Sequence, residues 1–324
     1  MCRSAEQVVQ VCLGLRQGER LVLIADSAEE EFGAAVFQAA TAAGAAISAF
    51  IVGSAELVNS AFHSRLTATL ATADASVLVC SIEGVPRSFR RHIIQVKGKP
   101  RRHAHILGIN ESVLRQSMMA DYDEVDRVGR HLRERLRKGN ALHVTTSTGT
   151  DLRVEFLPNH RWHLASGVQR EAGWTNFPGG ELLTSPGSVD GVYVPDGGAW
   201  LPDGATIERA ARIQLHFERG VLRRMEGDSA VIDQLERAIA TSPQARRVGQ
   251  VAFGTNTGVL APIGVMLQDL KMPGFHLTLG YPAPDDTGAN WTCPVEVPLR
   301  TRRPDVAIDE TLVMVRGKYV AGIL

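Results

Sequence analysis

Short apolar runs alternate with helical patterns through the first third of this chain, and this alternation restricts the possible folds more than any other feature. The apolar runs are bounded by turn signals, as buried strands are, and they lie at Arg20–Ala25, Ala46–Val52 and Ser76–Cys80. Patterns of helical period flank them at Ala5–Leu15, Glu29–Ala43 and Ala55–Ala73. The alternation predicts a parallel sheet with helices on its faces, and such sheets bind ligands beyond the carboxyl ends of their strands.

The second part of the chain has a different pattern, which predicts a second domain. A charged helix at Asp121–Arg137 ends at Gly139-Asn140, a natural boundary. Beyond it, strand and turn signals predict hairpins at 141–157 and 207–225, one helix at Ser229–Ala240, and further strands. We therefore predict an α/β protein. A parallel-sheet, Rossmann-like domain occupies residues 1–140, and a mixed α+β domain with a twisted, partly barrel-like sheet occupies residues 141–324.

Composition excludes several classes of function. The chain has 324 residues, with 35 basic and 35 acidic side chains, so its charge predicts neither a nucleic-acid nor a membrane partner. No apolar run is long enough to span a bilayer, and the N-terminus carries charges throughout, unlike a signal peptide. The four cysteines are scattered without paired spacing, which argues against a disulfide framework. These observations predict a cytoplasmic protein.

No glycine-rich phosphate-binding motif follows the first predicted strand, so this half implies neither a dinucleotide nor a P-loop nucleotide. The segment Arg87–His103 is strongly basic and almost free of acidic residues. It fits either an anion-binding patch or the solvated face of a helix.

Three stretches combine loop-forming Gly or Pro with polar residues that can act chemically: Trp174–Pro186, Gly254–Gly280 and Asn290–Leu299. Glu181 follows Pro178-Gly179-Gly180 in the first of them. Asp269 lies seven residues before His276, and Glu296 lies twenty after it. If these strands are neighbours, three carboxylates and one imidazole converge, a donor set that suits Zn, Mn, Co or Fe(II). The alternative is that the acids lie in surface turns and the histidine in a core.

The motifs GWTNFPGGELLTSP, FGTN, MLQDLKMPGFHLTLG and VEVPL resemble the aminopeptidase T family of metallopeptidases, in the same order and spacing. The pattern ERLVLIAD and the following Ala-rich helix are similar to that family's N-terminal domain. The resemblance extends to ring-opening relatives like 2,5-dihydroxypyridine dioxygenase, which use the fold to hold one Fe(II). It implies a homodimer, and it implies metal-ligand roles for Glu181, Asp269 and His276.

The chain departs from this family at two positions. The H-x-D pair that the family places on a late strand aligns with Pro294-Val295-Glu296, so only Glu296 retains a ligating side chain. A family glutamate before the strand that ends in Gly-Thr-Asn corresponds to Gln250, and an amide is a poor ligand for a divalent ion.

The leading prediction is a metal-dependent hydrolase of a peptide or amide, with a degenerate site. Its catalytic residue is Glu181. The predicted metal ligands are Glu181, Asp269, His276 and Glu296. The predicted metal is Zn, Co, Mn or Fe, and a site that has lost its metal is the alternative. Predicted substrate-binding residues are Trp174, Asn256, Tyr281 and Trp291. Two alternatives remain: a non-catalytic protein that binds a peptide or small molecule for a partner enzyme, and an Fe(II)-dependent ring-opening dioxygenase.

Overall fold

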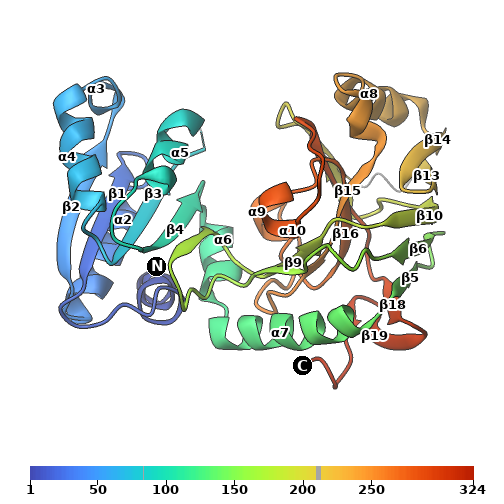
Figure 1. Ribbon diagram of the computed structural model, residues 1–324, viewed down its shortest axis with the longest axis horizontal. Coiled ribbons are helices and arrows are strands. Elements are labelled where there is room, and N and C mark those ends of the chain that lie inside the picture. Colours follow the sequence, from blue (N-terminus) through green and yellow to red (C-terminus); the bar gives the residue numbers. More distant parts are fainter. Residues whose placement is uncertain (83, 209–212) are drawn as a thin grey trace. The chain divides into compact units, whose positions relative to one another are not determined.

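The computed structural model describes residues 1–82, 84–208 and 213–324. The chain forms two compact units (Figure 1). The first comprises Met1–Asp126 and Ala165–Gly179, and the second comprises Arg127–Leu164 and Gly180–Leu324. Among the described residues, no helix is both long and apolar enough to cross a membrane.

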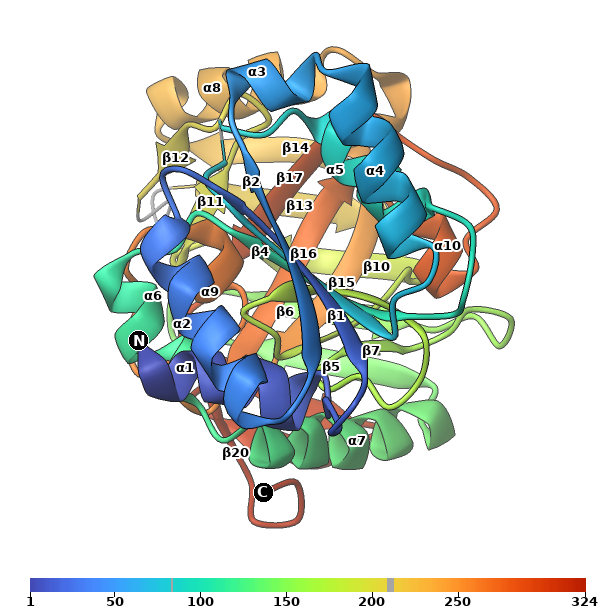
Figure 2. The ribbon, with the colours of Figure 1, turned by 90° about the vertical axis from the view of Figure 1, so that its left-hand side faces the viewer.

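The first unit contains a five-stranded sheet of order β2-β1-β3-β4-β8, and every pairing in it is parallel (Figures 1 and 2). Its strands are β1 (Arg20–Asp26), β2 (Ala46–Val52), β3 (Ala75–Cys80), β4 (Arg102–Leu107) and β8 (Gly173–Phe177). Its helices are α1 (Cys2–Glu6), the π-helix η1 (Gln7–Cys12), α2 (Glu30–Ala42), α3 (Ser54–Leu57), α4 (Ser60–Leu70), α5 (Arg87–Gln95), α6 (Glu111–Arg115) and the 3₁₀ helix η2 (Ser117–Met119). The predicted parallel sheet is confirmed.

Local chemistry explains where these elements begin and end. The helix predicted at Ala55–Ala73 is interrupted, because the Asn59 side chain accepts a hydrogen bond from the Phe62 N–H and starts α4 anew. One core cluster joins apolar side chains of α4 and α5 to β1, β2 and β3. In α2, the space above Gly33 is closed by the Ala25 methyl group of β1, so this helix packs directly on the sheet.

The second unit contains two open antiparallel sheets. The eight-stranded sheet has the order β14-β13-β10-β6-β5-β18-β19-β20, and the seven-stranded sheet has the order β12-β11-β17-β16-β15-β9-β7. The first of these consists of β5 (Ala141–Thr145), β6 (Asp151–Glu155), β10 (Ser188–Tyr193), β13 (Ile213–Glu218), β14 (Val221–Gly227), β18 (Asp305–Ile308), β19 (Thr311–Val315) and β20 (Lys318–Tyr319). The other consists of β7 (His163–Ala165), β9 (Glu181–Thr184), β11 (Gly198–Trp200), β12 (Thr206–Ile207), β15 (Val248–Gly254), β16 (Gly274–Gly280) and β17 (Glu296–Arg300). The helices are α7 (Tyr122–Lys138), which begins in the first unit, α8 (Ser229–Ile239), η3 (Pro243–Arg246), α9 (Met266–Asp269) and α10 (Pro284–Thr287).

Both predicted hairpins are present, as β5–β6 and β13–β14; residues 209–212 of the second prediction lie outside the described residues. Neither antiparallel sheet closes into a barrel within the described part of the chain. The domain boundary at residue 140 stays a prediction.

One large core lies between the two sheets and takes in side chains of α7 and α8. On β16, Phe275, Leu277 and Leu279 belong to this core. Successive side chains of a strand point to opposite faces, so His276 and Thr278 lie on the other face of the seven-stranded sheet. That second face carries the polar residues of interest.

Candidate active site

Strand register brings Glu181 and His276 together on the second face of the seven-stranded sheet. Glu181 pairs with Gly254, and Gly254 pairs in turn with Gly274, which lies two residues before His276. Because neither glycine has a side chain, the Met272 backbone can pass close to Gly254 and the Arg300 side chain can lie close to Gly274. His276 Nε2 lies 2.8 Å from Glu181 Oε1.

A lysine completes this group. Lys271 Nζ donates a hydrogen bond to Glu181 Oε2, so each carboxylate oxygen has a partner. The three side chains are nearly enclosed, with exposed fractions of 13% for Glu181, 9% for Lys271 and 3% for His276. Lys271, Glu181 and His276 are called the ionic triad below.

The triad has an unusual charge state for a buried site. Burial opposes the Glu181 charge, but the Lys271 ammonium and the His276 ring together hold the pKa of Glu181 far below its ordinary value. Burial lowers the pKa of His276, and the hydrogen bond from its ring to Glu181 offsets this only in part. At neutral pH Glu181 is therefore a carboxylate and His276 a neutral imidazole.

Backbone contacts fix the segment that supplies Lys271. Its carbonyl oxygen accepts the Asn256 N–H at 2.9 Å, which ties the segment after α9 to the end of β15. Asn256 is fully buried, and its side chain accepts the Gly258 N–H at 3.1 Å. The predicted substrate-binding residue Asn256 thus lies next to the triad segment and shapes the loop.

Asp269 is buried, and its carboxylate binds backbone N–H groups. Its two carboxylate oxygens accept N–H groups from Ile263 at 2.9 Å and Gly264 at 2.8 Å. Burial raises its pKa, although these two bonds and the Arg300 charge act in the opposite direction. Asp269 therefore closes the loop before α9, and it forms no ion pair with the triad.

Glu296 lies away from the triad and does not converge with Glu181 and His276 as predicted. It pairs with Gly280 at the far end of β16, whereas His276 pairs with Arg300 and Thr278 with Pro298. Gly280 lies four positions after His276 along β16, or roughly 13 Å away at the usual rise. The residue of β17 opposite His276 is thus Arg300, a cation at a position where an acid was predicted.

The remaining predicted residues are dispersed. Tyr281 packs against Leu183, Ala252 and Ala283 on the second face of the sheet. Trp291 packs on the main core, with the Arg247 guanidinium 3.9 Å above its ring. In the first unit, Trp174 is 52% exposed, and its ring meets that of His105 edge-on at 6.3 Å.

The donor set does not fit the metal ion that the family resemblance implies. Among the described residues, no group of three or more His, Cys, Asp and Glu side chains is placed to hold a metal. Glu181 is bonded on both oxygens, Asp269 serves the loop backbone, and Glu296 lies at the other end of the strand. The Lys271 ammonium bonded to Glu181 and the Arg300 guanidinium on the strand opposite His276 also repel a divalent cation.

Sequence reasoning missed Lys271 and Arg300. Lys271 is part of the motif MLQDLKMPGFHLTLG. Lysines are common and usually exposed, so a lysine in the sequence does not by itself indicate a buried functional residue. Gln250, expected at a lost ligand position, donates from its side chain to the Tyr281 carbonyl at 2.8 Å.

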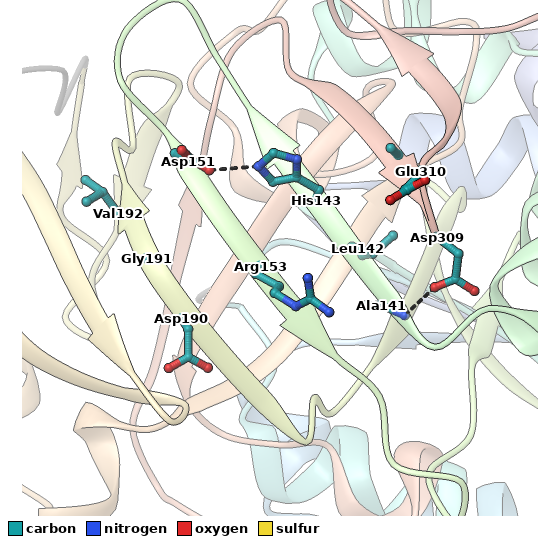
Figure 3. A pocket seen from close by; sticks show the side chains of 11 residues that line it. Ala141, Leu142, His143, Asp151, Arg153, Asp190, Gly191, Val192, Asp309 and Glu310 are labelled. Atoms are coloured by element: carbon teal, nitrogen blue, oxygen red, sulfur yellow. Dashed lines mark hydrogen bonds and ion pairs between the residues drawn. The ribbon is translucent and has the colours of Figure 1, made fainter.

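Hollows also lie elsewhere on the surface of the described residues. One, of about 830 Å³, lies over the outward face of β5, β6 and β10, where His143 bonds to Asp151 and Asp309 bonds to the N–H of Ala141 (Figure 3). This is the side of the eight-stranded sheet opposite the core, so it does not include the triad. The other, of about 400 Å³, is in the first unit and is lined by basic residues of the segment after α5 together with Trp174.

Comparison with known proteins gives the family. The model of the 2,5-dihydroxypyridine 5,6-dioxygenase family, NicX, matches residues 1–259, which is well over half of the 324 residues. The chain belongs to this family. The family match includes Glu181 and ends before Asp269. No curated protein matches the chain.

Two solved structures have the same fold over nearly the whole length. 2,5-Dihydroxypyridine dioxygenase from Pseudomonas putida superposes with a TM-score of 0.71 at 18% identity, covering 99% of this chain and 96% of that one. AmpT from Thermus thermophilus superposes with a TM-score of 0.68 at 18% identity, covering 99% and 98%. The predicted relation to both groups is confirmed for the fold, and the family membership lies with the dioxygenase relatives.

Proposed function

We propose that this chain is a hydrolase that cleaves a peptide or amide bond, with His276 as general base. The observation that carries the proposal is the buried hydrogen bond of 2.8 Å between His276 and Glu181. With the proton on Nε2, the ring donates to the carboxylate and leaves Nδ1 as a proton acceptor. A carboxylate that orients a neutral imidazole is the arrangement that general-base catalysis uses.

The same residues support the later steps of hydrolysis. Neutral His276 takes a proton from the attacking water and returns it to the leaving amine. The Lys271 ammonium supplies positive charge near the oxyanion that develops on the carbonyl. Because the donors do not fit a divalent ion, no step of this proposal passes through a metal.

The lowered pKa of His276 gives the proposal a pH signature. A general base must be unprotonated, so activity is retained above its pKa and is lost below it. We expect the acidic limb of the profile to lie below the ordinary histidine value of about 6.5.

The test is turnover of aminoacyl p-nitroanilides and N-acetyl amino acids by protein treated with a chelator. We expect activity without bound metal, a loss of about 100-fold or more in His276→Ala, and little change in His143→Ala, an exposed control. Activity that disappears with the chelator and returns with Zn or Mn would contradict the proposal. Binding of these probes without turnover by the folded wild type would favour the non-catalytic alternative.

The family match itself favours a second candidate, a ring-opening dioxygenase. Such a reaction requires a centre that activates dioxygen, for which Fe(II) with three protein ligands is the usual solution. The measurement is dioxygen uptake with 2,5-dihydroxypyridine and added Fe(II). Uptake that depends on Glu181 and His276 would support this candidate over the hydrolase.

A further inference from the structure

We infer that Arg300 binds the carboxylate of a small organic acid, so that the substrate is an amide that carries one carboxylate group. This inference rests on the proposed function, because it assigns the substrate class of the same site. The binding step itself is measurable without turnover.

Arg300 is a buried cation whose guanidinium makes no hydrogen bond or close ion pair within the described residues. Only 3% of the residue is exposed, and the Asp269 and Asp196 charges act on the guanidinium only from beyond ion-pair distance. Buried charges are normally paired, since an unpaired one is expensive to desolvate. None of its nitrogens is among the fully enclosed atoms that lack a partner, so the guanidinium still reaches solvent.

The surrounding backbone holds this side chain in place. The Arg300 carbonyl accepts a hydrogen bond from the Gly197 N–H at 2.8 Å. The Asp196 carboxylate accepts hydrogen bonds from the Thr301 hydroxyl and the Arg302 N–H, which directly follow Arg300. A methyl group at Gly197 would lie 3.1 Å from Arg300 Cγ, and one at Gly274 would lie 3.4 Å from Nη2. Two glycines thus make room for the arginine beside His276.

The nearby charges favour a monoanion. The Lys271 ammonium is bonded to Glu181, so Arg300 is the cation of this site with donors to offer. Asp269 and Glu181 are both acidic, and they would repel a phosphate dianion more strongly than a carboxylate. A planar guanidinium also matches the two oxygens of a carboxylate.

Calorimetric titration of the full-length protein with N-acetylglycine and with its neutral amide, N-acetylglycinamide, tests this. We expect the wild type to bind the acid at least tenfold more tightly than the amide. Arg300→Gln is expected to weaken binding of the acid by about 10- to 100-fold, since hydrogen bonds to charged groups are of that strength. Its effect on the amide is expected to be small. Arg302→Gln, an exposed neighbour on the same segment, is the matched control and is expected to bind like the wild type.

Equal binding of acid and amide by the wild type, or tighter binding of inorganic phosphate than of the acid, would overturn the inference. These comparisons need no variant, so they hold even if Arg300→Gln fails to fold. Preference for the acid without hydrolysis would retain the carboxylate site and refute the hydrolase. Hydrolysis of amides without preference for a carboxylate would support the hydrolase and refute the carboxylate site.

Discussion

A single buried carboxylate accounts for most of the chemistry at the residue scale. Glu181 stays charged because Lys271 and His276 each bond one of its oxygens. Burying an ion pair brings little net stability, but removing one partner leaves an uncompensated charge. The triad is therefore sensitive to loss of the lysine.

We predict that Lys271→Met destabilises the protein by about 3–5 kcal/mol, because the Glu181 charge is then largely unpaired. Urea unfolding followed by circular dichroism measures this. The control is Lys99→Met, which breaks the more exposed pair with Asp74 and is expected to cost about 1 kcal/mol or less.

The double variant Glu181→Gln with Lys271→Met separates charge from packing. We expect it to regain most of the lost stability, since neither buried charge remains. Equal unfolding free energies for Lys271→Met and Lys99→Met would mean that Glu181 does not depend on this ammonium.

At the scale of elements, the site depends on how closely the segment before β16 passes the end of β15. A methyl group added at Gly254 would overlap the Met272 carbonyl oxygen and the Lys271 backbone. Gly254 also pairs with Glu181. This one glycine therefore sets the separation between the strand that carries Glu181 and the segment that carries Lys271.

We predict that Gly254→Ala costs about 2–3 kcal/mol, because backbone atoms must shift to admit the methyl group. His276 and Lys271 are then displaced from Glu181, so activity falls as well. Gly322→Ala is the control, since its nearest contact is the end of the Arg135 side chain at 3.7 Å. Thermal unfolding of both variants checks this, and matching midpoints would contradict the close approach.

At the scale of the whole molecule, buried neutral histidines make the free energy of unfolding depend on pH. Burial is the largest cause that lowers the pKa of His103, His105 and His276. The pKa of His105 falls to about 4. Their folded pKa values lie below the unfolded value of about 6.5, so between these values the unfolded chain binds more protons. Stability from this source is therefore lost as pH falls from about 6.5 toward 4, and it is unaffected above that window.

We predict that His105→Gln flattens this dependence by up to about 1.4 kcal/mol per pH unit, the effect of one proton. The unfolding free energy in urea, measured from pH 7 to pH 4.5, gives the slope. His143→Gln is the control, because His143 is exposed and bonded to Asp151. A wild-type slope unchanged by His105→Gln would show that this ring takes up its proton without unfolding.

Local pattern was sufficient for much of the fold. The strands β1, β2 and β3 and the helices α2, α7 and α8 follow directly from apolar periodicity. Gly44 and Gly139 end α2 and α7, and such signals act within a few residues. The same reasoning selected Glu181 and His276, since each lies beside a glycine-bounded loop.

Tertiary structure alone decided the composition of the site. Which residue of β17 faces His276 depends on strand register, and register is set by pairing and packing over the whole sheet, so Arg300 rather than Glu296 occupies that position. Lys271 reaches Glu181 only because Asn256 and Gly254 hold two distant segments together. The sequence by itself determined the element types and two members of the triad, because those depend on short-range pattern. The charge that surrounds them depends on long-range contacts, which no short pattern encodes.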